Sequence, residues 1–181
     1  MKSGAAVVLR REESGDVQAI HAVEAEAFEH EDEADLVDRL RARGRNVLSL
    51  VATSDGVIVG HILLTRVQVE GAPDDRIVLG LAPVAVAAAR QRSGIGSQLV
   101  RAALGEAREG GAAAMVVLGH PEYYPRFGFV PARDHGLFCD YDPAGEAFFV
   151  MALAPGGLDG LAGRVRYAPE FDEGGPEHGA H

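Results

Sequence analysis

Two glycines, Gly94 and Gly96, stand at the start of a predicted amphipathic helix, directly after an apolar strand-like run that ends at Val86. Glycines at the start of a helix let backbone N–H groups come close to a phosphate, and the helix N-terminus adds a partial positive charge. Two nearby arginines, Arg90 and Arg92, add full positive charges. The stretch therefore predicts a loop that binds the pyrophosphate of a nucleotide cofactor.

Two common phosphate-binding loops do not fit this stretch. A dinucleotide-binding fingerprint needs a third glycine, as in G-x-G-x-x-G, but Leu99 stands at that position, and no acidic residue follows ~20 positions on at a strand end. A P-loop ends in Gly-Lys-Ser or Gly-Lys-Thr, whereas the single lysine of this chain is Lys2. A different nucleotide cofactor is therefore expected.

A second motif, G-H-P-E-Y-Y-P-R-F-G-F over residues 119–129, follows the strand-like run Met115–Leu118. Together with Gln91-x-x-Gly94-x-Gly96, it makes the chain resemble the GNAT superfamily of N-acetyltransferases. Tyr123 and Tyr124 occupy the first two positions of that superfamily's F-Y-x-x-x-G-F signature, and the whole motif is similar to its YhbS-like branch. The resemblance covers residues 5–153, and residues 154–181 are read as a C-terminal extension whose end is expected to be disordered.

The resemblance implies a fold and a cofactor. The fold would be a mixed α/β sheet of six or seven mostly antiparallel strands, with a central parallel pair splayed at a β-bulge, flanked by about four helices. The co-substrate would be acetyl-CoA, without a metal. The implied cofactor-binding residues are Val84, Ala85, Val86, Gln91, Arg92, Ser93, Gly94, Ile95, Gly96, Ser97 and Tyr124.

Hydrophobic periodicity and turn signals predict elements consistent with that fold. Asp55-Gly56 predicts a hairpin between strands at Val47–Ala52 and Val57–Leu64, the second of which can continue to Val69. Pro83, inside the apolar run Ile77–Val86, indicates a bulge in a central strand. The other predicted elements are a strand at Val7–Leu9, helices around Val17–Phe28, Ala34–Leu40, Gly94–Glu109 and Glu122–Phe127, and strands at Met115–Leu118 and Phe148–Leu153.

Acetyl transfer to an amine needs a proton donor for the departing thiolate and a neutral amine. The motif match assigns the donor to Tyr124, because a phenol stays protonated at neutral pH. For the base, the run Ile77–Val86 offers no carboxylate, so His120 is the first candidate, since histidine titrates near working pH. Weaker candidates are His61, Glu29, Glu31 and a chain of waters. The chain departs from the family pattern at Ala88, where many relatives have proline, and at Arg92, where glycine is frequent.

Length and composition limit the class of protein. A chain of 181 residues, 47% hydrophobic and 24% charged, suits one globular domain. No apolar run approaches the ~20 residues of a membrane span, and no signal-peptide pattern opens the chain, so a cytoplasmic location is expected. The lone Cys139 excludes an internal disulfide, and the histidines show no metal-ligand spacing.

The net charge of −10 is unevenly distributed, with eleven acidic residues and no Lys or Arg between Glu12 and Asp38. Such a region disfavours nucleic acid and would attract a cationic acceptor, although it is equally consistent with a solvated helix face. The predicted function is acetyl-CoA-dependent N-acetylation of a primary amine, most simply a small molecule. Acetylation of protein N-termini or lysines and a non-catalytic acyl-CoA-binding module are the alternatives. An exposed last strand would allow a homodimer.

Overall fold

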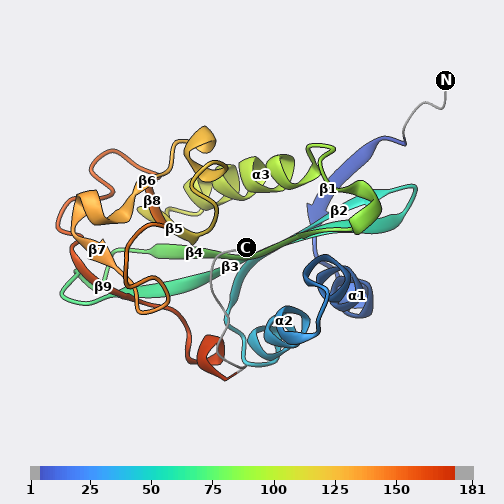
Figure 1. Cartoon of the computed structure of the whole chain (residues 1–181), viewed down its shortest axis with the longest axis horizontal. Helices are drawn as coiled ribbons and strands as arrows, with labels where there is room; N and C mark the ends of the chain where they lie inside the picture. Colours follow the sequence, from blue (N-terminus) through green and yellow to red (C-terminus); the bar gives the residue numbers. More distant parts are fainter. Residues whose placement is uncertain (1–4, 174–181) are drawn as a thin grey trace. The chain divides into compact units, whose positions relative to one another are not determined.

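The computed structural model describes residues 5–173, which form three α-helices and nine β-strands (Figure 1). The chain divides into two compact units. The first contains the described residues up to Leu64 together with Pro83–Ala103. The second contains Thr65–Ala82 and the described residues from Leu104 onward.

In the first unit, β1 (Val7–Arg11) pairs antiparallel with β2 (Asn46–Ser54), and β3 (Val57–Val69) follows after a tight turn. Asp55 and Gly56 form this turn with φ angles of 52° and 76°, the left-handed conformation that a two-residue hairpin requires. Helices α1 (Val17–Phe28) and α2 (Asp32–Ala42) pack side by side (Figure 1).

Gly60 and His61 on β3 show which layers cover this part of the sheet. A Cβ on Gly60 would lie 3.0 Å from Leu99 and 3.1 Å from Ile95, so Gly60 faces α3 (Ile95–Glu109). Successive strand residues point to opposite faces. His61 therefore faces the other layer, where its ring bonds to Glu24 of α1. The side chains buried in this unit include Ile20, Leu36, Val37, Leu40, Leu50, Val51, Ile62 and Leu99.

In the second unit, the first half of β4 (Val78–Val86) runs parallel to β5 (Ala114–Leu118), with Val78 opposite Ala114 and Leu81 opposite Val117. β8 (Phe148–Ala152) pairs antiparallel with β5 on one side and with the two-residue β6 (Val130–Pro131) on the other. β9 (Gly163–Arg166) pairs antiparallel with the end of β3 and parallel with β7 (Leu137–Phe138). The core beneath these strands includes Val67, Val116, Leu137, Phe148, Val150, Leu161 and Val165.

The predicted fold class is confirmed: the sheet is mostly antiparallel and contains the parallel pair β4–β5. Three details differ. Residues 124–127 form a 3-10 turn rather than a fourth helix. The strands number nine among the described residues, because β6 and β7 are only two residues long and β9 lies in the extension. The strand expected to be last, β8, is followed by β9, and it pairs with β5 on one side and, at Phe149 and Val150 alone, with β6 on the other.

The extension after residue 153 contributes β9 and a 3-10 turn at Pro169–Asp172. The sequence of β9 is Gly-Arg-Val-Arg. Because it contains only one apolar side chain, Val165, no apolar run predicted a strand there. The expected disorder at the C-terminus concerns residues 174–181, which lie outside the described residues. Across residues 5–173, each α-helix is too short or too polar to cross a membrane.

Candidate functional site

The loop between β4 and α3 presents backbone N–H groups to an open space. The first bond of α3 joins the N–H of Gln98 to the carbonyl of Gly94 at 3.0 Å, so the N–H groups of Ile95 and Gly96 have no acceptor within the helix. Gly94 has φ 87°, and a Cβ added there would meet nothing within 4 Å. The space beside Gly94 is therefore open, at the end of α3 that favours an anion.

Side chains of the same loop hold its shape. Ser93 donates its hydroxyl to the carbonyl of Arg90. Gln91 donates to the carbonyl of Val86 at 3.1 Å, and Arg90 donates to the hydroxyl of Ser54 at 3.1 Å. Gln91 and Ser93, both predicted to bind the cofactor, thus also organise the loop, whereas Arg92 is exposed on it.

Arg92 has φ 62°, a left-handed conformation that costs an L-residue about 1 kcal/mol or more. Glycine adopts this conformation without strain, and glycine is the residue that the resemblance leads us to expect here. Compared with glycine, Arg92 therefore adds backbone strain and also adds a positive charge to the loop that carries the open N–H groups.

The end of β4 carries three of the predicted cofactor-binding residues, Val84, Ala85 and Val86. Ala85 is buried, while Val84 and Val86 are half-buried. The parallel pairing with β5 ends at Leu81, two residues before Pro83, although β4 itself continues to Val86. The carbonyl of Val86 already accepts the bond from Gln91.

In the second unit, Tyr124 begins the 3-10 turn that follows β5. It is 2% exposed, and its ring packs against Tyr123 and Phe129 with centroid distances of 5.0 and 5.8 Å. Burial, helped by Tyr123, raises the pKa of the Tyr124 phenol, which keeps it protonated at neutral pH. The phenol therefore carries the proton that a donor must have at neutral pH, although the same burial makes it a weaker acid.

The backbone before Tyr124 is shaped to receive its ring. A Cβ on Gly119 would lie 2.0 Å from Cε2 of Tyr124, so only glycine fits at that position. The N–H groups of Tyr123 and Tyr124 donate to the carbonyl of His120 at 3.0 and 3.4 Å. The imidazole of His120 itself is exposed and has no hydrogen-bond partner within residues 5–173. A base usually needs a partner that orients it, and the described residues give His120 none.

The weaker candidate bases occupy three different environments. Glu29 is exposed at the left-handed end of α1, with φ 59°. Glu31 bonds to Nε2 of His21 at 2.6 Å. His61 is completely buried, and its two ring nitrogens bond to Glu24 at 2.6 Å and to Ser49 at 2.8 Å. Of these candidates, only His61 is buried and bonded at both nitrogens.

Sequence reasoning missed Tyr167, which lies over the middle of β4. A Cβ on Gly80 would be 2.8 Å from Cε1 of Tyr167, and the ring packs between Tyr141 and Phe171 with centroid distances of 5.9 and 5.1 Å. Its hydroxyl is buried, and none of the described residues 5–173 offers it a hydrogen bond. Burial raises the pKa of this phenol, with smaller contributions from Cys139, Tyr141 and Tyr124. The glycine inside the strand-like run was the available signal, because such a glycine often marks a close approach.

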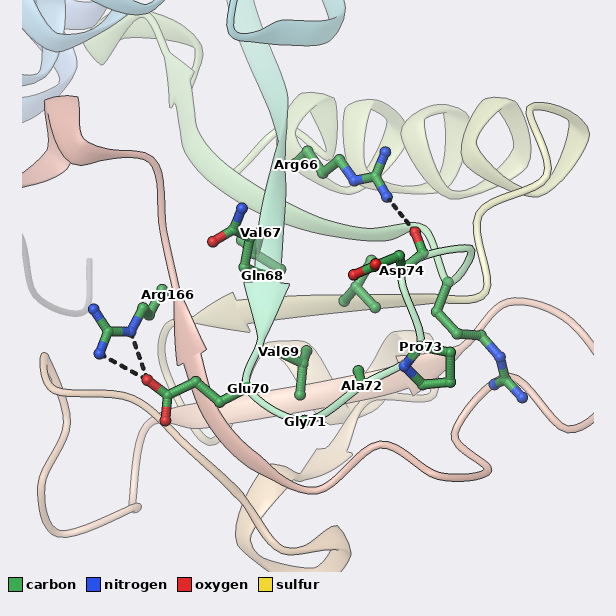
Figure 2. Close-up of a pocket in the computed structure, with 12 residues that line it drawn as sticks. Arg66, Val67, Gln68, Val69, Glu70, Gly71, Ala72, Pro73, Asp74 and Arg166 are labelled. Atoms are coloured by element: carbon green, nitrogen blue, oxygen red, sulfur yellow. Dashed lines mark hydrogen bonds and ion pairs between the residues drawn. The ribbon is translucent and has the colours of Figure 1, made fainter.

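A pocket in the second unit opens at the turn between β3 and β4 (Figure 2). Its arginines are engaged by the protein: Arg166 bonds to Glu70 at 2.7 Å, and Arg66 donates to the carbonyl of Asp74 at 3.3 Å. Arg76 donates to the carbonyl of Gly156 at 3.1 Å. None of the predicted site residues lines this pocket, so it is separate from the residues that the two motifs single out.

One group of side chains on α1 and α2, His21, Asp35 and Asp38, brings potential metal ligands within 4.8 Å of one another. Both ring nitrogens of His21 already bond to carboxylates, to Asp38 at 2.7 Å and to Glu31 at 2.6 Å. The bonds to Asp38 and Glu31 raise the pKa of His21, which favours the imidazolium. Because an imidazolium has no lone pair to offer, this geometry suits an ion pair better than a metal.

Comparison with known proteins identifies the family. Residues 8–132 match the family described as acetyltransferase (GNAT) domain. The chain is 38% identical over 167 residues to the uncharacterized N-acetyltransferase YhbS of Escherichia coli K12, covering 92% of this chain and 99% of YhbS. The structure of this chain is similar to the crystal structure of Escherichia coli YhbS in complex with CoA. The TM-score is 0.89 at 37% sequence identity, and the match covers 95% of each chain. A GNAT family acetyltransferase from Brucella melitensis in complex with acetyl-CoA gives a TM-score of 0.77, at 35% identity and 93% and 99% coverage. The chain therefore belongs to the GNAT family of acetyltransferases.

Proposed function

We propose that this enzyme transfers the acetyl group of acetyl-CoA to the primary amine of a small molecule, by direct attack of the amine on the thioester in a ternary complex. The proposal is supported by the family, by the two related structures solved with CoA and acetyl-CoA, and by the loop between β4 and α3. The observation that carries it is the open face of Gly94, beside N–H groups that have no acceptor within α3.

In this proposal the loop binds the pyrophosphate. The N–H groups of Ile95 and Gly96 donate to phosphate oxygens, the N-terminus of α3 stabilises their charge, and Arg92 adds a full positive charge. Ser97 contributes from the first turn of α3, and Val84, Ala85 and Val86 contact the pantetheine arm. Holding the thioester in this way replaces a bimolecular encounter with an oriented one.

The chemical step requires three proton transfers. The acceptor's ammonium group loses a proton to one of the candidate bases or to a chain of waters, so that the nitrogen lone pair can attack the thioester carbon. The C–S bond of the resulting tetrahedral intermediate then breaks, and the nitrogen loses a second proton as the amide forms. Tyr124 donates its phenolic proton to the departing thiolate, so that free CoA leaves as the thiol. The resulting phenolate regains a proton before the next turnover.

The acceptor is proposed to be a small cationic amine. The proposal includes neither nucleic acid nor a membrane as a partner. The acidic stretch from Glu12 to Asp38, which forms α1 and α2, would raise the local concentration of a cation. The predicted cytoplasmic location belongs to the same proposal.

The test is the release of CoA thiol from acetyl-CoA in the presence of a panel of primary amines that includes polyamines, amino sugars, amino acids and a lysine-containing peptide. We expect release with at least one small amine and none without protein. Release with the peptide alone would instead identify a protein acetyltransferase. Binding of acetyl-CoA without release for any amine would identify a non-catalytic acyl-CoA-binding protein.

A further inference from the structure

The ring of Tyr167 lies directly on the backbone of β4. Tyr167 follows the last residue of β9 and belongs to the second unit, as do Gly80 and Val67. A Cβ added to Gly80 would lie 2.8 Å from Cε1 of Tyr167 and 2.9 Å from Cγ1 of Val67, so these two side chains fill the space that a side chain at residue 80 would take. Only a glycine in the strand allows an aromatic ring to come this close.

Neighbouring side chains hold the Tyr167 ring in place. Its centroid lies 5.9 Å from that of Tyr141 and 5.1 Å from that of Phe171. Tyr141 donates its hydroxyl to the carboxylate of Asp172, the residue after Phe171. The N–H of Phe171 donates to the carbonyl of Ala168 at 3.0 Å, which closes the turn that carries both residues. Displacing the Tyr167 ring would therefore disrupt the packing of three aromatic rings.

On one face of β4, the accessible positions end where this ring begins. Successive strand residues point to opposite faces, so every second residue shares a face with Gly80. On that face the positions nearer the end of the strand, Ala82, Val84 and Val86, are half-buried, and the positions between them are buried. Gly80 itself is buried, because Tyr167 covers it. A ligand that lies along this face would therefore meet the ring at Gly80.

The proposed placement of the cofactor directs its acyl group toward Gly80. With the pyrophosphate at the loop after β4 and the pantetheine arm along Val84–Val86, the thioester would lie further toward the start of the same strand. A strand rises about 3.3 Å per residue, so Gly80 lies about 13 Å before Val84 along β4. The acyl group is the terminal part of the cofactor, so each added carbon would extend it toward the Tyr167 ring.

Tyr124, the proposed proton donor, belongs to the same unit as Tyr167. Burial is the main cause of the raised pKa of Tyr167, and Tyr124 is among the groups whose charge adds to it. The two phenols therefore lie within electrostatic reach of each other, and a sulfur atom that takes its proton from Tyr124 would hold its acyl group near Tyr167. Tyr167 is half-buried, and its effect here comes from the space that its ring fills rather than from its buried hydroxyl.

We propose that Tyr167 determines which acyl-CoA the enzyme accepts, because its ring occupies the space over Gly80 that an acyl chain of four or more carbons would need. Acetyl-CoA fits without moving the ring, whereas a butyryl or hexanoyl group would have to displace it. Removal of the ring would open space over Gly80 beside the apolar side chain of Val67. This proposal rests on the acetyl transfer proposed above and adds a limit on the acyl group.

The test measures CoA release from acetyl-, butyryl- and hexanoyl-CoA with the best amine of the panel. Tyr167→Ala removes the ring, Tyr167→Leu removes it while keeping more of the packing, and Tyr167→Phe removes the hydroxyl alone. Phe138→Ala is the matched control, because Phe138 is an exposed aromatic residue of β7 in the same unit. The kcat/KM ratio of two donors is compared within each protein, so that a general loss of stability cancels, and the unfolding temperature shows that each variant is folded.

The wild-type protein is expected to prefer acetyl-CoA over hexanoyl-CoA by about 100-fold or more, because the longer donor lacks room for its added methylene groups. Tyr167→Ala and Tyr167→Leu are expected to reduce this preference about 10-fold or more, whereas Tyr167→Phe and Phe138→Ala should keep it. Equal use of the two donors by the wild-type protein, or an unchanged preference in both variants that lack the ring, overturns this proposal and leaves the acetyl transfer standing. Failure of the wild-type protein to transfer the acetyl group to any amine overturns both proposals.

Discussion

A Cβ added to Gly119 would lie 2.0 Å from Cε2 of Tyr124, well inside the distance at which two carbon atoms repel each other. Gly119 directly follows the last residue of β5, and Tyr124 is the first residue of the 3-10 turn. The proposed acid therefore occupies space that any side chain at residue 119 would take.

Gly119→Ala is expected to displace the Tyr124 ring, to lower the free energy of unfolding by about 1–3 kcal/mol and to reduce CoA release strongly. Urea unfolding and the thiol-release assay measure the two effects. Gly105→Ala is the matched control, because a Cβ there meets nothing within 4 Å and alanine favours the helix by about 0.5–1 kcal/mol. A Gly119→Ala protein with wild-type stability would show that the turn does not depend on this contact.

Tyr124→Phe is expected to lower kcat about 100-fold or more while leaving acetyl-CoA affinity unchanged, because the ring and its packing remain and only the transferable proton is lost. The rate of CoA release measures kcat, and calorimetric titration measures the affinity for acetyl-CoA. Tyr123→Phe, at the neighbouring ring 5.0 Å away, is expected to keep most of the activity. If both variants were equally active, the thiolate would take its proton from another donor.

The ion pairs of His21 make part of the stability depend on pH. Its bonds to Asp38 and Glu31 raise its pKa in the folded protein above the value of 6.5 expected for the unfolded chain. The stabilisation is thus fully present below pH 6.5 and is lost as the pH rises through the folded pKa. His21→Gln should flatten this dependence in urea titrations between pH 5.5 and 9, and the exposed His135→Gln should not. Parallel curves for wild type and His21→Gln would mean that the pair contributes no pH-dependent stability.

The parts of the account that could be predicted from the sequence are those fixed by neighbouring residues. The hairpin at Asp55-Gly56 and the start of α3 after Gly94 depend on local φ angles, which the residue types reveal directly. The assignment of Tyr124 came from a contiguous motif, and it stays a prediction until activity is measured. The left-handed φ of Arg92 was not predicted, although the expectation of glycine at that position pointed to it.

The hydrogen-bond partners of His61 could not be predicted, because they are distant in sequence. Glu24 and Ser49 lie 37 and 12 residues from His61 along the chain. Nothing in the local pattern distinguishes Glu24 from the other acidic residues of the first helix, which together suggested only a charged surface. The interpretation of this acidic region as a solvated helix face is therefore only partly right, because Glu24 and Glu33 are buried.

The most direct test of the central claim is calorimetric titration of acetyl-CoA into the wild-type protein, Gly94→Glu and Gly44→Glu. Both glycines have a left-handed φ, 87° and 65°, and both have open space where a side chain would go, so each variant adds one negative charge at a position with a strained backbone. Gly44 lies just after α2 and is not part of the loop between β4 and α3. The account predicts micromolar binding by wild type and Gly44→Glu, and no detectable binding by Gly94→Glu. Equal binding by all three proteins would show that the loop before α3 does not hold the pyrophosphate.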